Sequence, residues 1–292
     1  MQYFNPTTSN GYNTPDEMKK VWSVQLDLTK KFQEVCTRHG FRFWMDGGTL
    51  LGAVRHHGFI PWDDDIDLAM MRDDYDKLNK IASQEFTYPY FWQTTFTEDA
   101  FFCGHAQLRN VETSAIGKSE LDKDYCRGIA IDIFILDGVP GNAVSYALHR
   151  LGTKIVNKAT RFIIKHPNIF LSHKTMFRLY EAMFRANKVG KSNQIGYISW
   201  KYRHHEVFCK SYYDDTIMLD FANLQLPAPI LYKELLCHYY GNDYMMPKMA
   251  PNFHGQKYLN AEISYKQIVS ELKNNPELFS RQIKLLYQHS VQ

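Results

Sequence analysis

The stretch "IPWDDDIDLAMM", residues 60–71, holds four aspartates within five positions and then continues into an apolar run. In an extended strand, side chains two positions apart project from the same face, with their Cα atoms about 6.5 to 7 Å apart. Asp65 and Asp67 are therefore predicted to point together, while Ile66 and Leu68 point into the core. Two carboxylates this close repel each other unless they are protonated or bridged by a cation, and hard oxygen ligands favour Mg²⁺ or Mn²⁺. The stretch predicts a strand that begins at a metal site, and the alternative is a solvated acidic turn.

A glycine pair upstream of the aspartates supports the metal site. In "DGGTLLG", residues 46–52, Gly47 and Gly48 let the backbone approach a ligand closely. The start of the helix that follows offers free N–H groups to a phosphate. Many ordinary turns share this pattern, so the glycine pair supports the predicted metal site only in combination with the aspartates.

A lone acid interrupts the most strand-like segment of the chain, "GIAIDIFIL" at residues 128–136. Burying an unpaired carboxylate costs several kcal/mol, so Asp132 is expected to contact a metal, a basic partner or backbone donors. A purely structural hydrogen bond is the alternative. If this strand lies beside the strand of Asp65 and Asp67, the three acids can converge on one metal centre.

The succession of helix and strand patterns predicts an α/β (α+β) fold, in which helices pack on a mixed sheet. The first helix is expected to be capped by Thr14, with Pro15 in its first turn and Glu17 closing a capping box, and to stop at Gly40. The later elements are expected to be a strand at 41–45, a helix after the glycine pair, a strand at 66–70, a helix capped near Asp73, and strands within 89–95, 103–116 and 128–140.

Helical patterns dominate after about residue 141. We therefore expect a catalytic core at 1–140 and a mostly helical part at 141–292 that completes the substrate site and does not fold independently. Between Arg150 and Lys191 there are ten Lys/Arg residues and one acid, Glu181.

Composition narrows the class of protein. The 292 residues are 45% hydrophobic and 22% charged with a net charge of +3, which suits a globular protein and not a general nucleic-acid binder. Five cysteines without C-x-x-C spacing argue for a reducing compartment and against a zinc site or a disulfide framework. The first residues lack a leader pattern, and no run reaches about 18 apolar residues, so a cytoplasmic protein without a spanning helix is expected.

The segment "MDGGTLLGAVRHHGFIPWDDDIDLAMMRDDYDKL", residues 45–78, resembles the signature of the LicD/fukutin family, a branch of the nucleotidyltransferase-fold superfamily. The resemblance continues through "QLRNVETSA" (107–115) and "GIAIDIFILDGVP" (128–140) and returns in "LPAPILYKELLCHYYGNDYMMP" (226–247). It covers about residues 40–250, with 141–200 poorly matched. It implies a nucleotidyltransferase-like mixed sheet flanked by helices.

The resemblance also implies phosphoryl-group transfer. Bacterial members of the family move phosphocholine from CDP-choline to a sugar hydroxyl of a surface glycan, and animal members move ribitol phosphate from CDP-ribitol. We therefore expect a Mg²⁺- or Mn²⁺-dependent transferase with a CDP-linked donor, most simply CDP-choline, and CMP as the released product. The expected acceptor is a lipopolysaccharide, teichoic acid or capsule glycan that can be lipid-linked.

Carried over residue by residue, the resemblance assigns Asp65 and Asp67 to the metal-binding pair and Asp132 to the third carboxylate, which could also accept the proton of the attacking hydroxyl. The remaining matches are Gly48 and Thr49 at the phosphate-side turn, Arg55 and His56 in the family's "R-H", and Trp62 and Asp63 in its "P-W-D". Arg55 and Arg109 are candidate phosphate ligands, and a surface ion pair is the alternative for either.

Two other functions stay open. One is a nucleotidyltransferase that attaches a nucleotide to a small molecule, a protein or RNA. The RNA case is disfavoured because the basic bias lies at 150–191, away from the motif. The other is a catalytically inactive binding subunit, which the presence of all three acids disfavours.

The segment from Arg150 to Lys165 is a candidate membrane-binding helix. Its basic residues recur at spacings of three or four and share a helix face, beside apolar side chains, as in a helix that lies on an anionic membrane. An ordinary solvated face is the alternative. The basic residues are Arg150, Lys154, Lys158, Arg161 and Lys165, and the apolar ones are Leu151, Ile155, Phe162 and Ile163.

Overall fold

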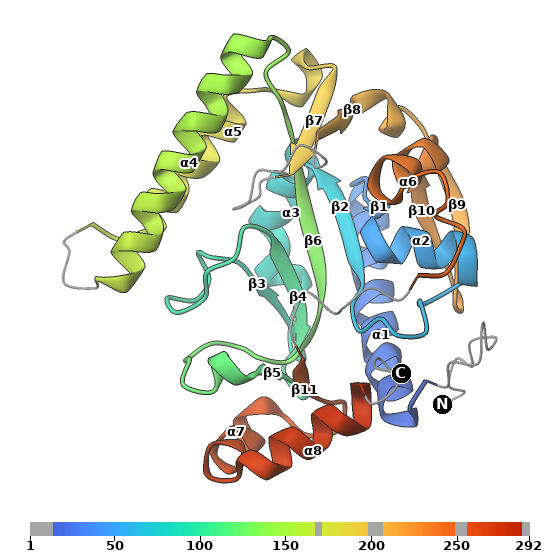
Figure 1. Ribbon diagram of the computed structural model, residues 1–292, viewed down its shortest axis with the longest axis vertical. Coiled ribbons are helices and arrows are strands. Elements are labelled where there is room, and N and C mark those ends of the chain that lie inside the picture. The colour runs from blue at the N-terminus through green and yellow to red at the C-terminus, as the bar shows by residue number, and fades with distance from the viewer. Residues whose placement is uncertain (1–13, 167–170, 198–206, 249–255, 288–292) are drawn as a thin grey trace.

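A computed structural model describes residues 14–166, 171–197, 207–248 and 256–287. Its centre is a seven-stranded mixed sheet in which the long strand β6 (Ile129–Gly138) runs parallel to β2 (Asp67–Met71) and antiparallel to β4 (Ala106–Asn110) (Figure 1). The remaining strands of this sheet are β1 (Trp44–Met45) beside β2, β3 (Tyr90–Gln93) beside β4, β7 (Gln194–Tyr197) beside the end of β6, and β8 (Val207–Cys209) beside β7.

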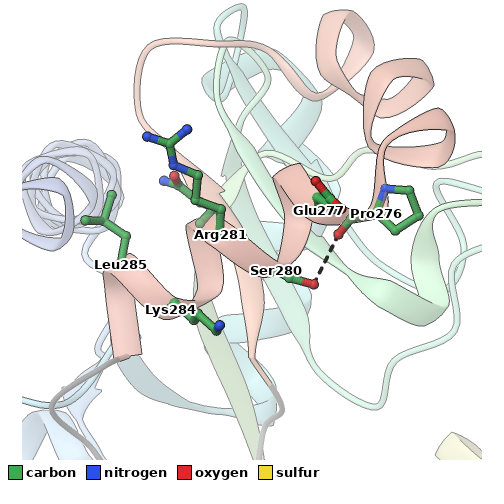
Figure 2. Close-up of a pocket in the computed structure, with 7 residues that line it drawn as sticks. Pro276, Glu277, Ser280, Arg281, Lys284 and Leu285 are labelled. Carbon is green, nitrogen blue, oxygen red and sulfur yellow. Dashed lines mark hydrogen bonds between the residues drawn. The ribbon is translucent and has the colours of Figure 1, made fainter.

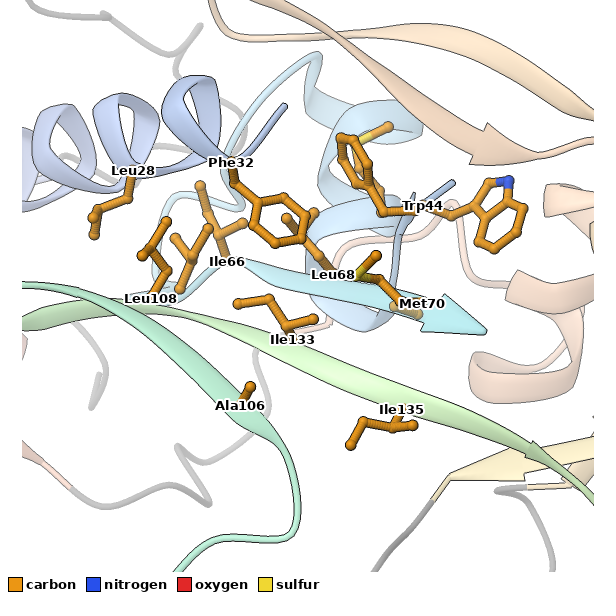
Figure 3. Packing of buried hydrophobic residues seen from close by; sticks show 14 of the residues in the cluster. Leu28, Phe32, Trp44, Ile66, Leu68, Met70, Ala106, Leu108, Ile133 and Ile135 are labelled. Atoms are coloured by element: carbon orange, nitrogen blue, oxygen red, sulfur yellow. The ribbon is translucent and has the colours of Figure 1, made fainter. Parts of the chain in front are cut away.

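Helix α1 (Asp16–His39) covers one face of this sheet. Figure 3 shows Leu28 and Phe32 of α1 pointing onto apolar side chains of β2, β4 and β6. Along the first half of β6, buried isoleucines alternate with partly exposed residues, so Asp132 lies on the face away from α1. The sheet thus has an apolar side that makes the core and a polar side on which chemistry can occur.

The ends of α1 show one correct and one wrong prediction. Gly40 ends the helix, as predicted, with a left-handed φ of 67° that favours glycine. The predicted cap at Thr14 does not form: the helix begins at Asp16, Pro15 occupies the cap position without a side-chain cap, and the Thr14 hydroxyl donates to the carbonyl of Pro61 at 3.0 Å.

The other helices surround the sheet (Figure 1). Helix α2 (Gly47–His56) connects β1 to β2 and packs on α6 (Tyr232–Tyr240), while α3 (Arg72–Glu85) packs on β2 and β6. Helices α4 (Ala143–Lys165) and α5 (His173–Arg185) form an antiparallel hairpin that leans out from the sheet, and α7 (Tyr265–Asn274) and α8 (Pro276–Tyr287) close the opposite end. Short 3-10 turns lie at Lys118–Glu120, Val189–Lys191 and Lys210–Tyr213.

The part after residue 140 is helical, as predicted, but it also contributes strands that the sequence pattern did not indicate. Besides β7 and β8, these are β9 (Thr216–Phe221), which pairs with β10 (Leu224–Pro229), and β11 (Lys257–Asn260), which pairs with β5 (Ser114–Gly117). The chain beyond the predicted boundary therefore returns to the sheet. Within the described ranges, no helix has the length and apolarity needed to cross a membrane.

Candidate active site

Strands β2 and β6 bring two of the predicted acids together. In their parallel register Asp67 lies opposite Asp132, and the Asp132 N–H donates to the carbonyl of Ile66 at 2.9 Å. Ile66 and Leu68 are fully buried, whereas Asp65 and Asp67 are partly exposed, so the predicted alternation is present. Strands β2 and β6 are therefore adjacent, as a shared metal centre requires.

Two hydrogen bonds hold the start of α2 beside the start of β2. The Asp46 N–H donates to the carbonyl of Asp67 at 3.0 Å, and the Thr49 hydroxyl accepts from the Asp67 N–H at 2.8 Å. Both glycines of the turn stand where a side chain would meet an acid: a Cβ on Gly47 would lie 3.0 Å from Asp67 Oδ2, and a Cβ on Gly48 would lie 2.7 Å from Asp63 Oδ2. The glycine pair therefore lets the acids approach the first turn of α2.

The crowded acids resist ionisation. Burial and the neighbouring charges of Asp65 and Asp132 raise the pKa of Asp67 well above its usual range. Burial and the charges of Asp65 and Asp64 do the same to the pKa of Asp63. Such a site gains stability from a cation that neutralises the carboxylates.

The donor set fits a hard divalent cation. Asp67 and Asp132 lie opposite each other on β2 and β6, and Asp63, Asp64 and Asp65 each offer an oxygen within 4.8 Å of the others. Carboxylate oxygens are the ligands that Mg²⁺ and Mn²⁺ prefer. Asp64 is drawn partly away, because the Tyr287 hydroxyl of α8 donates to its Oδ2 at 2.6 Å. The assignment of the ion to Asp65, Asp67 and Asp132 stays a prediction, and Asp63 and Asp64 are the acids whose oxygens lie within 4.8 Å of an oxygen of Asp65.

Gln107 on β4 and His105, the residue before β4, make two contacts to Asp132 that were not predicted from the sequence. Gln107 donates from Nε2 to Asp132 Oδ1 at 2.5 Å, and Nε2 of His105 lies 3.3 Å from the same oxygen. Burial opposes ionisation of Asp132, but the adjacent His105 ring and these hydrogen bonds lower the pKa of the carboxyl below its ordinary value. Although burial opposes it, contact with Cys103 and Asp132 raises the pKa of His105 well above its usual value. The period of two along the predicted strand at 103–116 could have placed His105 and Gln107 on one face.

Asp46 forms a second buried acid beside the site. It is 3% exposed and accepts hydrogen bonds from the hydroxyls of Tyr197 and Tyr239, the latter at 3.1 Å. Burial raises its pKa despite these bonds. Tyr197 lies on β7 and Tyr239 on α6, so the part of the chain after residue 140 reaches the glycine turn. No local sequence signal connects residues this far apart.

Arg55 and His56 lie at the end of α2, where they connect this helix to the segment after α6. Arg55 donates from Nη1 to the carbonyls of Tyr244 and Met246 at 3.0 and 3.3 Å, and from Nε to His56 Nδ1 at 3.3 Å. His56 is buried and meets the half-buried ring of Trp62 edge to face, with centroids 6.3 Å apart. Burial lowers the pKa of His56 to about 4. The phosphate-binding role of Arg55 stays a prediction.

The surface ion pair that was the alternative for Arg109 does not form among the described residues. Arg109 is buried in the sheet and not in a surface ion pair, because Nη1 donates to the carbonyl of Gly128 at 2.6 Å while Nε and Nη2 donate to Gln93 and Gln107. The bond to the side-chain oxygen of Gln107 turns the Gln107 amide nitrogen toward Asp132. Arg109 thus positions a neighbour of the acid, and a phosphate would have to break one of these bonds to reach it.

A surface hollow elsewhere on the molecule does not belong to this site. It has a volume of about 610 Å³ and lies over α8 (Figure 2). Its lining runs from Pro276 to Leu285 and contains none of the aspartates described above. All of its lining residues come from α8 alone.

A glycine turn, carboxylates on two adjacent strands and a mixed sheet covered by helices are the features that the predicted nucleotidyltransferase-like fold requires. Residues 40–121 match the family model described as "LicD/FKTN/FKRP, nucleotidyltransferase domain". The lipopolysaccharide cholinephosphotransferase LicD of Haemophilus influenzae is 29% identical over 243 residues, which cover 76% of this chain and 89% of that protein. The human ribitol 5-phosphate transferase FKRP is 44% identical over 46 residues, which cover 16% of this chain and only 9% of that protein. Residues 40–121 are therefore similar to the nucleotidyltransferase domain of this family, in line with the predicted resemblance, and the similarity to LicD over most of both chains supports a phosphotransferase.

Proposed function

We propose that this chain transfers phosphocholine from CDP-choline to a hydroxyl group of a cell-surface glycan and releases CMP, with Mg²⁺ or Mn²⁺ held by Asp65, Asp67 and Asp132. The observation that carries the proposal is the pairing of Asp67 with Asp132 across adjacent strands. The similarity to a lipopolysaccharide cholinephosphotransferase over most of both chains supports the reaction class and the glycan acceptor.

The residues of the chain position and neutralise the donor. A bound divalent ion supplies positive charge to the phosphate oxygens and the leaving group. The first turn of α2 lies against the acids, since Cβ atoms on Gly47 and Gly48 would meet Asp67 and Asp63, and the start of a helix favours an anionic phosphate. Thr49 keeps this helix turn in register with Asp67 through its hydroxyl. Little covalent work is left for the protein beyond holding these groups in place.

The lowered pKa of Asp132 bears on its role. A general base works best when its pKa lies near the working pH, because it must be ionised and still attract the proton. A carboxylate stabilised in its charged form by His105 and Gln107 is better suited to holding a cation. We therefore assign Asp132 primarily as a metal ligand and only secondarily as the acceptor of the proton.

Aromatic rings beside the acids support a cationic head group. Tyr240 is 41% exposed and meets the ring of Tyr239 edge to face, with ring centroids 6.0 Å apart. Burial and the charges of Asp67 and Asp46 raise the pKa of its hydroxyl. Tyr239 and Tyr197 lie against Asp46. Aromatic faces and carboxylates together are the surroundings that quaternary ammonium groups prefer. The neutral polyol of a ribitol phosphate donor would not use these charges.

A cytoplasmic location is part of the proposal. The five cysteines are all free, which suits a reducing compartment.

Product analysis tests the proposal against its alternatives. The protein is incubated with CDP-choline, CDP-ethanolamine, CDP-glycerol, CDP-ribitol or CTP, with Mg²⁺ and lipopolysaccharide, and CMP and pyrophosphate are both measured. We expect CMP with CDP-choline, and none after addition of EDTA. Pyrophosphate from CTP would instead identify a nucleotidyltransferase. Binding of the donors without either product would identify an inactive binding subunit.

A further inference from the structure

The outward face of α4 is apolar, which is the reverse of an ordinary surface helix. The residues that α4 buries include the polar side chains of His149, Thr153 and Thr160. Five large apolar side chains recur instead at intervals of four, three, four and seven and lie on one exposed stripe. This stripe, called here the α4 stripe, consists of Val144, Leu148, Leu151, Ile155 and Phe162, which are between 57% and 71% exposed.

The hairpin holds the α4 stripe in a fixed direction. Helix α5 packs on β6 and on α4, and the two helices approach closely enough that a Cβ on Gly152 would lie 2.4 Å from Cε of Met183. Glu181 of α5 makes a buried ion pair with Arg72 at 3.2 Å, and Lys174 pairs with Asp99 at 2.5 Å. Because α5 lies between α4 and the sheet, the outer face of α4 points away from the body of the protein (Figure 1).

A row of cations borders the α4 stripe on one side. Helix α4 contains no Asp or Glu. Its lysines and arginines make no ion pair with any residue that the structure describes. The row consists of Lys154, Lys158, Arg161 and Lys165, all of them exposed. Ile163, which the sequence analysis counted with the exposed apolar group, is 9% exposed and packs inward instead.

We propose that α4 docks this enzyme on an anionic phospholipid bilayer, with the α4 stripe among the acyl chains and the cationic row at the phosphate level. Long exposed apolar surfaces mark interaction sites, and an amphipathic helix with a basic flank matches the chemistry of an anionic lipid interface. A second copy of this chain is a poorer occupant. It would bring a second cationic row to the contact, and Glu181, the acid of α5, is already buried against Arg72.

Vesicle flotation of the full chain tests the proposal. We expect binding to vesicles with about 30% phosphatidylglycerol and no binding to pure phosphatidylcholine, because the cationic row needs anionic head groups. Binding should weaken at about 0.5 M salt, where exposed charges are screened. The measurement does not depend on the donor or on turnover, so it stands or falls separately from the proposed reaction.

Three variants separate the parts of the proposal. Replacing Lys154, Lys158 and Arg161 together with Glu should weaken binding at least about tenfold. Changing Leu151 and Ile155 together to Gln should also weaken binding while leaving the secondary structure intact, since both side chains are exposed. A matched control changes Lys266, Arg281 and Lys284 to Glu, which alters the net charge by the same amount on exposed positions of α7 and α8. The control should bind as the wild type does.

Several results would overturn the proposal. The wild-type protein at low salt could fail to float with anionic vesicles, or could float equally with neutral ones. The control could lose as much binding as the α4 variant, which would leave only an effect of net charge. Light scattering could instead show a dimer that the change of Leu151 and Ile155 to Gln dissociates, in which case a second copy covers the stripe.

Discussion

The pair β2–β6 and the helix α4 use the same kinds of residues in opposite ways. In the strand pair, Ile66 and Leu68 are buried while Asp65 and Asp67 face outward. In α4, by contrast, Thr153 and Thr160 are buried while Leu151 is 57% exposed. Burial of Ile66 and Leu68 offsets the repulsion between the acids of the strand pair, whereas α4 has apolar surface that no described residue of the chain covers. The first arrangement indicates a site for a small charged ligand, and the second indicates a surface for a large apolar one.

Removing one acid of the strand pair is the largest change. Asp67→Asn should lower kcat about a thousandfold, ~4 kcal/mol, because it removes a proposed metal ligand. The melting temperature without metal should stay the same or rise, since the change relieves the repulsion that raises the pKa of Asp67. CMP release and thermal unfolding measure the two effects. Retention of more than about a tenth of kcat, a loss below ~1.4 kcal/mol, would exclude the metal role.

The same experiment on Asp132 separates a ligand from a structural acid. Asp132→Asn should behave like Asp67→Asn and leave a folded protein. If Asp132→Asn mainly unfolds the chain, its bonds to Gln107 and His105 are structural and the third-ligand assignment fails.

Arg109 supports the strand pair from the side, and its loss should act mainly on stability. Arg109→Met leaves the acceptors on Gln93, Gln107 and Gly128 without a donor in a buried place, which should cost about 2 to 4 kcal/mol. Denaturant unfolding measures the loss. Arg38→Met is the control, since Arg38 pairs with Glu85 at the surface and such pairs contribute less than about 1 kcal/mol. Equal effects of the two changes would contradict the positioning role of Arg109.

The glycine turn should respond to a single methyl group. In Gly48→Ala the new Cβ would lie 2.7 Å from Asp63 Oδ2, so the Asp63 carboxyl must shift. We expect kcat/KM to fall about tenfold, ~1.4 kcal/mol, with little change in melting temperature. Gly141→Ala, where a Cβ meets nothing within 4 Å, should leave both unchanged. An unaffected kcat/KM in Gly48→Ala would show that the turn does not need its close approach to the acids.

His56 should make stability depend on pH. Its pKa is lowered from an ordinary 6.5 to about 4. Between these two pH values, His56 is mostly protonated in the unfolded chain and mostly neutral in the folded chain. Its contribution to stability is therefore complete above pH 6.5 and is lost as the pH falls toward 4. In His56→Gln, the decline in unfolding free energy between pH 6.5 and 4 should be shallower than in the wild type. A slope no shallower than that of a control change at the exposed His166 would contradict this account.

The smallest effect is expected on the α4 stripe. Leu151→Gln should change the free energy of unfolding by less than about 0.5 kcal/mol, because Leu151 is already in water in the free protein. In the strand pair, Leu68→Ala should cost about 2 to 5 kcal/mol, since Leu68 is fully buried. Denaturant unfolding of both variants makes the comparison direct. A large loss in Leu151→Gln would mean that the side chain is covered within the protein.

The sequence predicted the strand pair well because its signals are local. The period of two from Asp65 to Leu68 specifies a strand with one acid-bearing face, and the apolar run around Asp132 specifies a second strand, whose partly exposed face the sequence did not indicate. The family resemblance assigned the three acids to one metal site, which requires the two strands to lie close together. Neither signal reveals which partners an acid acquires from distant elements, so the bonds of Asp46 to Tyr197 and Tyr239 and of Asp132 to His105 were not predicted.

The prediction was weaker where tertiary contacts decide the outcome. In α4 the apolar and polar residues share a helical period, and only the position of α5 determines that Ile163 faces inward and Phe162 outward. Arg109 carries a charge, which suggested the surface, but the partners on Gln93 and Gly128 allow it to be buried. The strands β7 to β11 have three to six residues each and take their stability from pairing with other segments.

Direct measurement of cation binding tests the central claim, that Asp65, Asp67 and Asp132 hold a divalent ion for phosphate transfer. Mn²⁺ is titrated into the wild-type protein, Asp67→Asn and Asp132→Asn, with free Mn²⁺ followed by electron paramagnetic resonance and CMP release from CDP-choline measured on the same samples. The account predicts that each variant binds Mn²⁺ at least about tenfold more weakly, ~1.4 kcal/mol, and that CMP release falls in parallel. Equal Mn²⁺ affinity in all three proteins, or CMP release that persists in EDTA, would contradict it.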